Sequence, residues 1–485
     1  QINMATILLF TYNCGQTQHA VSEIRAALSS AVAKAIPDLL FISLQELAPL
    51  DDAFYFNAAD NYVNPFIDAA TSFLPAAGPQ LTLVSNVRTG ITAGLLFANK
   101  TAVVVDADVR DAAASFGIMK TGLKGAAAVR VKIRPAPFTE LTFVATHLAA
   151  HPGAAAVAKR WANFGTLARS LAFFAPYNSG DEYVVKDIDN DEIRERDFLY
   201  KDNAHVFLLG DLNFRVNIGT PDAPAKVPTS TADFIDTWLP VDELSGILAT
   251  PTPSRTALWG FREVAPLSFA PTYKFSSSST AANAYASKRV PAWCDRVLVL
   301  DGFASAPLSA TALDTLAYAS VPRTVLGGSD HAAVYAVVKV PFEAAPGLLS
   351  PDVLEALTKH DIAASSDFAA YTAEPPTPEV AAAIKLGRAQ YKLATTQVSL
   401  QNDHIAARGR RIRSFESWIG LLFFLFLTRR GNAVFFAMLA MLISLFLYAQ
   451  PRLAAYISKN KDMSILALIF GKERAARPPR RRRHN

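Results

Sequence analysis

The sequence predicts a layered α/β domain followed by a membrane-associated tail. Up to about residue 342, short apolar runs alternate with segments of helical periodicity, and Pro, Gly or Ser clusters separate them. Several apolar runs end in a polar residue, which places the ends of several strands at one edge. After residue 417 the composition changes to long apolar runs flanked by arginines.

Eight apolar runs predict β-strands in the first 342 residues. The opening run has no basic lead and continues directly into polar Thr11 and Asn13, so we interpret it as a strand and not as a signal peptide. The runs are TILLFTYN (6–13), LLFISLQE (39–46), AGLLFAN (93–99), AVRVKI (128–133), LTFVATH (141–147), HVFLLGD (205–211), DRVLVL (295–300) and HAAVYAVVKV (331–340).

Two segments between these runs have apolar residues at helical spacing. Residues 16–36 and 154–174 therefore predict amphipathic helices. Residues 343–377 are rich in Ala and Pro and indicate a loose connector, whereas residues 378–413 favour a long exposed helix. We expect a catalytic domain over residues 1–342 and a partly helical linker over residues 343–416.

The tail contains two apolar runs separated by TRRGN. The run 433–449 has 17 residues, about 26 Å as a helix, which spans a bilayer core of roughly 30 Å with help from flanking residues. A single span through both runs would place Arg429 and Arg430 near mid-membrane at about 2.5–3.5 kcal/mol each, which disfavours it. One span with an interfacial segment and a tight hairpin both remain possible. We expect a hydrophobic membrane anchor over 417–450 and a basic tail over 451–485.

Charge and cysteine content exclude several classes of protein. The net charge is +5, but residues 401–485 alone carry +12, which leaves −7 for the first 400 residues. An acidic body is unlike a general nucleic-acid binder, which needs a basic face. The two cysteines, Cys14 and Cys294, are far apart in the sequence, which excludes a disulfide scaffold and a structural zinc site and favours a reducing, cytosol-facing compartment.

Polar residues at the strand ends indicate a metal-assisted hydrolytic site. Each residue alone is typical of a turn or a helix cap, but so many at similar positions favour a common rim. Carboxylate and amide oxygens with few imidazoles suit a hard ion such as Mg²⁺ better than zinc. The rim residues are Asn13, Glu46, His147, Asp211, Asn213, Asp295, Asp330 and His331.

A second cluster in residues 269–296 offers cations and a hydroxyl to an anionic substrate. Tyr273, Lys274, Lys288 and Arg289 bracket a Ser-rich stretch. Charge alone fits a solvated loop equally well. The neighbouring aromatic residues and prolines favour a structured loop.

Eight ordered blocks resemble the inositol polyphosphate 5-phosphatases, which are magnesium-dependent members of the endonuclease/exonuclease/phosphatase superfamily. GDLN and SDH alone are common to nucleases of the superfamily, whereas PTYK together with PAWCDR is specific to the 5-phosphatases. The blocks are FTYNCG, SLQEL, GLKGAAAVR, THLAAH, LLGDLNFRV, FAPTYKF, KRVPAWCDRVL and SDHAAV. The resemblance implies the DNase I-like four-layer α/β sandwich.

The resemblance also implies residue roles. Glu46 would be the main metal ligand, with Asn13 and Asp330 beside it. Asp211 would orient or deprotonate the attacking water and Asn213 would steady water and phosphate. His331, paired with Asp295, and His147 would contact the scissile phosphate. The neighbouring 4-phosphate would be contacted by Tyr273, Lys274, Lys288 and Arg289. Lys124 would contact the phosphate nearer the lipid.

Two positions depart from the family pattern. Leu123 stands where Asn is expected, and Ala332 stands where Arg is expected. Both departures concern substrate contacts or packing and leave the proposed metal and water residues in place. The order of catalytic domain, linker, apolar segment and basic tail is similar to that of fungal tail-anchored members, which implies a cytosolic catalytic domain on the endoplasmic reticulum.

The leading hypothesis is a Mg²⁺-dependent, membrane-anchored enzyme that removes the 5-phosphate of phosphatidylinositol 4,5-bisphosphate. One alternative keeps the fold and changes the substrate to nucleic acid or sphingomyelin. Another is a phosphoinositide-binding protein without turnover, suggested by Leu123 and Ala332. Tethering would raise the concentration of the active site at the lipid headgroups, which gives the tail a physical purpose.

Overall fold

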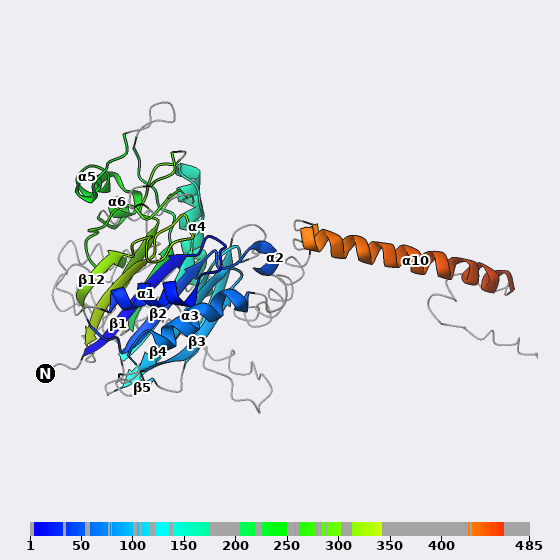
Figure 1. The fold of residues 1–485 in the computed structure, drawn as a ribbon, viewed down its shortest axis with the longest axis horizontal. Helices are drawn as coiled ribbons and strands as arrows, with labels where there is room; N and C mark the ends of the chain where they lie inside the picture. Colours follow the sequence, from blue (N-terminus) through cyan, green and yellow to red (C-terminus); the bar gives the residue numbers. More distant parts are fainter. Residues whose placement is uncertain are drawn as a thin grey trace, which may run out of the picture. The chain divides into compact units, whose positions relative to one another are not determined.

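Two β-sheets, each built from strands distant in sequence, form the framework of the first part of this computed structural model (Figure 1). The chain divides into two units, residues 1–421 and 422–485. The structure describes residues 4–32, 35–53, 59–75, 78, 80–99, 104–105, 109–116, 122–134, 139–171, 173, 199, 204–218, 226–249, 258, 261–276, 281, 284–287, 289–301, 313–341, 422, 425–426 and 429–459.

The first sheet has six strands. Its spatial order is β12 (Asp314–Ser320), β13 (Val334–Pro341), β1 (Met4–Asn13), β2 (Leu39–Gln45), β4 (Thr92–Asn99) and β3 (Leu81–Thr89). Strands β1 and β2 are parallel and the other neighbours are antiparallel.

The second sheet is also mixed, with β8 and β9 parallel. Its order is β10 (Phe261–Glu263), β11 (Asp295–Asp301), β9 (Ala204–Asp211), β8 (Thr139–His147), β7 (Lys124–Arg134) and β5 (Val104–Val105), and β6 (Arg110–Phe116) also pairs with β7.

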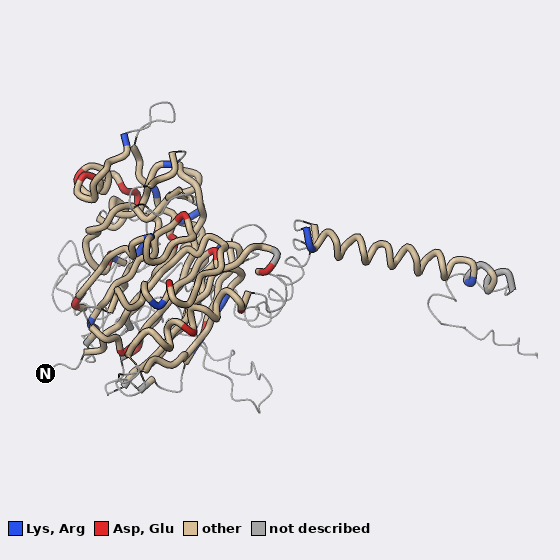
Figure 2. The backbone as a smooth tube through the Cα atoms, viewed as in Figure 1, with Lys and Arg blue, Asp and Glu red and all other residues tan. Residues whose placement is uncertain are grey.

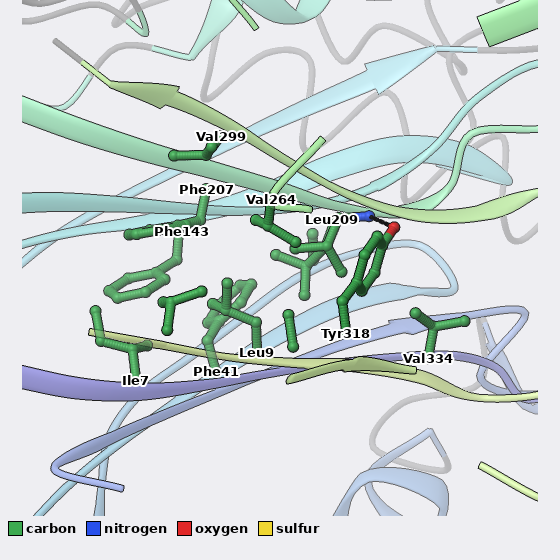
Figure 3. Packing of buried hydrophobic residues seen from close by; sticks show 14 of the residues in the cluster. Ile7, Leu9, Phe41, Phe143, Phe207, Leu209, Val264, Val299, Tyr318 and Val334 are labelled. Carbon is green, nitrogen blue, oxygen red and sulfur yellow. Dashed lines mark hydrogen bonds between the residues drawn. The ribbon is translucent and has the colours of Figure 1, made fainter. Parts of the chain in front are cut away.

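The pleat of the strands explains the layering, because successive side chains point to opposite faces of a sheet. In β1, Ile7 and Leu9 join the core between the two sheets, whereas Leu8 and Phe10 join a second core on the outer face. Figure 3 shows the inter-sheet core, where side chains from both sheets meet. Strands buried on both faces are near-continuously apolar, as the sequence shows.

Helices cover the outer faces of the two sheets. Helices α1 (Val21–Ala31) and α3 (Asp60–Ser72) pack beside each other on the first sheet, and α4 (Ala154–Ser170) packs on β6 and β7 of the second. The arrangement is helix, sheet, sheet, helix, which is the predicted four-layer sandwich. Other short helices among the described residues are α2 (Leu50–Ala53), α5 (Thr231–Thr237), a 3₁₀ turn (Leu239–Val241) and α6 (Glu243–Ala249).

All eight predicted strands are confirmed, with shifted ends in some cases. The strand predicted over 331–340 begins only at Val334, so His331 belongs to the loop that precedes it. The helix predicted over 16–36 is shorter: α1 begins at Val21, because Gly15 and Gln16 adopt φ of +59° and +58° and carry the chain around a turn. Strands β3, β6 and β12 and helix α3 were not predicted.

The described part of the second unit is mainly one helix, α10 (Arg429–Lys459). Residues 429–452 are long and apolar enough to cross a membrane, and this is the one such helix among the described residues. Leu422, Leu425 and Phe426 before it are also helical, and where Arg429 and Arg430 lie relative to a membrane stays a prediction. The predicted linker helix over 378–413 and most of the first apolar run lie outside the described residues.

Candidate active site

The strand register brings the predicted polar residues to one edge. His147 of β8 lies opposite Asp211 of β9, and Asp211 lies opposite Asp295 of β11. In the other sheet the last residue of β1, Asn13, lies opposite Gln45, so Glu46 follows at the same end. This edge joins the two sheets, because the Asn13 amide nitrogen donates to Asp211 Oδ2 at 2.9 Å.

Backbone geometry at this edge is unusual. Glu46 and Asn213 have φ of +44° and +59°, which is uncommon for residues other than glycine and clusters at functional sites. Gly210 has φ of +154°, and a Cβ there would lie 1.8 Å from the Thr146 carbonyl oxygen. The close approach of β8 and β9 therefore requires glycine just before Asp211.

Asp211 lies at the centre of the site and is almost fully buried. Its Oδ1 accepts the backbone N–H of Asn213 at 3.0 Å, and its Oδ2 lies 3.2 Å from His147 Nε2 and 3.8 Å from His331 Nε2. Burial alone would raise the pKa of Asp211, but the two imidazoles and the Lys124 ammonium outweigh it and hold the pKa well below its usual range. The carboxylate is therefore charged at neutral pH.

His331 and Asp295 form a buried pair, with His331 Nδ1 2.8 Å from Asp295 Oδ2. Thr272 Oγ1 donates to the same carboxylate oxygen at 2.6 Å. Burial alone would lower the pKa of His331, but Asp295 and Asp211 raise it to about 9. Nε2 of a protonated imidazole is then directed at the space near Asp211, where it can donate to an anion.

His147 differs from His331 in charge. Its pKa is lowered by burial and by the nearby Lys124 ammonium, so the ring is neutral at pH 7. Lys124 Nζ contacts His147 Nε2 and lies 3.8 Å from Glu46 Oε1. Burial also lowers the pKa of Lys124. Lys124, which the resemblance assigned to a distant phosphate, thus lies among the central residues.

Two cationic residues line a surface pocket of about 780 Å³. Lys274 and Arg289 belong to its wall, together with Ser276, Tyr285, Ala286 and Ser287. The pocket adjoins the buried pair, because the Tyr273 ring lies 4.7 Å from the His331 ring and Lys274 Nζ is 2.5 Å from Asp330 Oδ2. Lys288 lies outside the described residues. The structure therefore brings three of the four predicted phosphate-contacting residues together.

The donors fit a hard cation. The Glu46 carboxylate is partly exposed, and its contacts with described residues are Lys124 and His147 at 3.8 and 3.9 Å. Asn13 Oδ1 accepts one bond, from Gly15 N at 3.1 Å, and keeps a second lone pair. The described residues contain no cluster of three or more His, Cys, Asp or Glu side chains suited to a metal. One carboxylate and an amide are what Mg²⁺ uses and what a structural zinc site does not.

Asp330, the third predicted metal ligand, contacts other side chains than Lys124, which Glu46 contacts. Its Oδ2 is paired with Lys274, and its Oδ1 is 4.0 Å from His331 Nε2. A role as metal ligand stays a prediction.

Sequence reasoning missed one buried residue of this site, Arg215. It donates to the Asn213 side-chain oxygen and lies 4.5 Å from the Tyr273 ring centroid. The signal was available, because an arginine four residues after a strand end, between the apolar residues Phe214 and Val216, has to find partners if it is buried.

Comparison with known proteins identifies the fold and family. Residues 10–337 match the model of endonuclease/exonuclease/phosphatase family 2. The chain is 28% identical over 219 residues to polyphosphatidylinositol phosphatase INP53 of Saccharomyces cerevisiae, covering 45% of this chain and 16% of that protein. It is 30% identical over 269 residues to human phosphatidylinositol 4,5-bisphosphate 5-phosphatase A, covering 54% of this chain and 23% of that one. The chain thus spans less than a quarter of these relatives.

A solved structure has the same fold. The inositol polyphosphate 5-phosphatase domain of SPsynaptojanin, in complex with inositol (1,4)-bisphosphate and a calcium ion, superposes with a TM-score of 0.51 at 19% identity. The superposition covers 83% of this chain and 93% of that domain. The predicted DNase I-like fold is confirmed.

Proposed function

We propose, because the chain belongs to the endonuclease/exonuclease/phosphatase family, that it is a divalent-metal-dependent phosphoinositide 5-phosphatase. Its substrate would be phosphatidylinositol 4,5-bisphosphate, and the products phosphatidylinositol 4-phosphate and inorganic phosphate. The names of the two relatives, a polyphosphatidylinositol phosphatase and a 5-phosphatase, support this substrate class.

The observation that carries the proposal is the continuity between a hydrolytic centre and a cationic pocket. Tyr273 contacts His331 on one side of this boundary, and the next residue, Lys274, lines the pocket with Arg289. Two vicinal phosphates of one inositol ring need two adjacent anion sites. The centre around Asp211 would take the 5-phosphate and the pocket the 4-phosphate.

The chain's own residues supply the hydrolytic steps. Asp211, ionised and fixed by Asn13 and Asn213, orients a water molecule and accepts its proton as the water oxygen bonds to phosphorus. The bond between phosphorus and the ring oxygen breaks, and the ring oxygen takes up one proton from solvent, which balances the proton that passes from the attacking water to Asp211 and then to solvent. The imidazolium of His331 donates to a phosphate oxygen on which negative charge increases.

Glu46 would hold the metal ion, with Asn13 and Asp330 as further donors. When bound, Mg²⁺ would neutralise charge on the transferred phosphate and its leaving oxygen. His147 is neutral and buried beside Glu46 and Asp211, so it can donate a hydrogen bond without adding charge.

Helix α10 supports an anchored enzyme. Between its terminal arginines the helix contains no Lys, Arg, Asp or Glu (Figure 2). Most of the side chains there are exposed, for example Phe446 at 65% and Met441 at 71%. The uncharged part, residues 431–450, is about 30 Å long as a helix and contains the apolar run 433–449, which is long enough for a hydrocarbon core of roughly 30 Å with help from the flanking residues. We propose that it holds the catalytic unit at a cytosol-facing membrane surface, with the endoplasmic reticulum as the expected compartment.

A substrate panel tests the activity. Purified full-length protein in detergent micelles would be given phosphoinositides, soluble inositol phosphates, abasic DNA and sphingomyelin, each with Mg²⁺ and with chelator. We expect Mg²⁺-dependent phosphate release from lipids that carry a 5-phosphate. Preference for DNA or sphingomyelin would replace the proposed substrate class, and lipid binding without release at saturating Mg²⁺ would make the protein a binding module.

A further inference from the structure

Arg215 is a buried cation near the proposed reaction centre. Arg215 is 8% exposed, and its guanidinium contacts the side chains of Asn213 and Tyr273. We propose that Arg215 is a positioning residue that sets the orientation of the Asn213 amide and of the Tyr273 ring. This inference rests on the proposed function for the role of those two side chains.

The contact with Asn213 fixes which way the amide faces. Arg215 Nη2 donates to Asn213 Oδ1, and Arg215 Nε donates to the Asn213 carbonyl oxygen at 3.1 Å. The amide nitrogen donates one of its two N–H groups to the Leu148 carbonyl oxygen at 3.1 Å. The second N–H group is directed away from Arg215 and is available to water or phosphate. The flipped amide is disfavoured, because it would place N–H groups against the N–H groups of the guanidinium.

The same two bonds hold the strained backbone at Asn213. Its φ of +59° costs free energy unless neighbouring groups stabilise it. The backbone N–H of Asn213 donates to Asp211 Oδ1 at 3.0 Å. Arg215, by retaining this conformation, also keeps the Asp211 carboxylate in its orientation.

The second contact joins Arg215 to the other side of the site. Its guanidinium carbon lies 4.5 Å from the centroid of the Tyr273 ring, the distance of a cation–π contact. That ring lies 4.7 Å from the ring of His331. A single planar cation thus orients a residue that follows β9 and a residue of the loop that carries Lys274.

Arg215 is itself firmly held. Its backbone N–H donates to Glu243 Oε2 at 3.0 Å, and the Glu243 N–H donates to the Arg215 carbonyl at 2.9 Å. Glu243 Oε2 also accepts Arg160 Nη2 at 2.8 Å. Arg160 Nη1 in turn donates to the carbonyls of Ala149 and His151, beside Leu148. Both partners of the Asn213 amide are therefore anchored by one connected set of bonds.

A double-mutant cycle tests whether Arg215 acts through Asn213. Turnover of phosphatidylinositol 4,5-bisphosphate by the full chain would be measured for the wild type, Arg215→Met, Asn213→Ala and the double variant. We expect Arg215→Met to lower kcat by about tenfold to a hundredfold with little change in KM. In the Asn213→Ala background the same change should cost less than about threefold. Equal losses in both backgrounds would overturn the inference.

Arg215→Lys separates shape from charge. Lysine keeps the positive charge but cannot make two bonds to Asn213 and lie flat against Tyr273 at once. We expect it to restore less than half of the lost kcat. Full activity with lysine would contradict the proposed geometry.

A readout without turnover separates this inference from the proposed function. Hydrogen–deuterium exchange of the segments 211–216 and 271–276 should increase in Arg215→Met. The matched control is Arg130→Met, since Arg130 is also buried, lies 4.1 Å from an aromatic ring and pairs with Glu140. If the wild type hydrolyses no phosphoinositide, the proposed function fails, and exchange alone decides on Arg215: unchanged exchange, or an equal increase in the control, would refute its positioning role.

Discussion

At the scale of residues, Asp211 depends on side chains contributed by both sheets. Asn13 comes from the first sheet and His147 from the second, and Asp295 of the second sheet holds His331, whose Nε2 lies 3.8 Å from Asp211 Oδ2. Their positions follow from strand register, so a small shift in pairing would disperse the site. The polar residues at strand ends were therefore predictable as a group, because strands that end together bring their last residues together.

Asp211→Asn should lower kcat by about a hundredfold to ten-thousandfold, because asparagine cannot take the proton of water. Phosphate release at saturating Mg²⁺ measures the effect. The control is Asp60→Asn, which removes a half-exposed carboxylate paired with Arg88 and should leave turnover unchanged. An Asp211→Asn protein with more than a tenth of wild-type activity would exclude the assigned role.

His19 makes stability depend on pH. Burial lowers its pKa, while its ring, beside Tyr12 and Glu23, is bonded to the Cys14 carbonyl. Below the ordinary pKa of about 6.5 the unfolded chain binds a proton that the folded protein does not. Protonation of His19 therefore favours the unfolded chain. The free energy of unfolding has its full value above about pH 6.5 and decreases as the pH falls below it.

His19→Gln should therefore show a smaller decrease in unfolding temperature between pH 7.5 and pH 5 than the wild type. Glutamine keeps a donor for the Cys14 carbonyl, so the comparison isolates the titration. Thermal unfolding in the two buffers measures it, and identical slopes for both proteins would refute this source of acid sensitivity.

The sequence did not predict side-chain contacts that depend on how distant segments pack together. Arg215 reaches Asn213 and Tyr273 because the chain turns after β9. Lys124 contacts His147 because β7 and β8 are neighbours in register. Both contacts join segments whose proximity is set by the whole fold.

At the scale of elements, Arg296 ties β11 to β10 and to the start of α6. It is fully buried, donates to Asp242 Oδ2 at 2.8 Å, contacts Glu263 and reaches Ser245 Oγ at 3.2 Å. The two carboxylates raise the pKa of Arg296 above its usual value despite burial. Arg296 directly follows Asp295 in β11, so its contacts fix the position of β10 and α6 beside the strand that carries Asp295.

Arg296→Met should reduce the free energy of unfolding by about 3–5 kcal/mol, because Asp242 and Glu263 would be left buried without their cation. Urea unfolding of the full chain in micelles measures the change. Arg25→Met, at an exposed position of α1, is the control and should cost less than about 1 kcal/mol. A loss below that value for Arg296→Met would show that the buried pairs contribute little.

The central strands were predictable as elements because burial on both faces leaves them continuously apolar. Strands β6 and β12 were not predicted, since RDAAASF and DTLAYAS contain few large apolar residues and gain their strand conformation from pairing with β7 and β13. Helix α3 contains Pro65, which weakens its helical pattern in the sequence.

At the scale of the whole molecule, the proposed function requires helix α10, which is long and apolar enough to cross a membrane, to anchor the proposed hydrolytic unit. Replacing Leu439 and Leu442 by Arg should prevent insertion, because each charge near the centre of the span costs about 2.5–3.5 kcal/mol. We expect the variant to lose flotation with lipid vesicles and to hydrolyse vesicle lipid more slowly by roughly a hundredfold or more.

The matched control replaces both leucines by Val and should float with the vesicles. Turnover of a dispersed short-chain phosphoinositide should be unchanged in both proteins, since the catalytic unit is untouched. Vesicle binding by the Arg variant equal to that of the Val variant would remove helix α10 as the anchor.

The proposed function depends on which phosphate of the inositol ring is removed. Chromatographic identification of the monophosphate formed from phosphatidylinositol 4,5-bisphosphate by the full chain with Mg²⁺ tests it most directly. We expect phosphatidylinositol 4-phosphate, with no product in the presence of chelator. Formation of phosphatidylinositol 5-phosphate would contradict the assignment of the two anion sites.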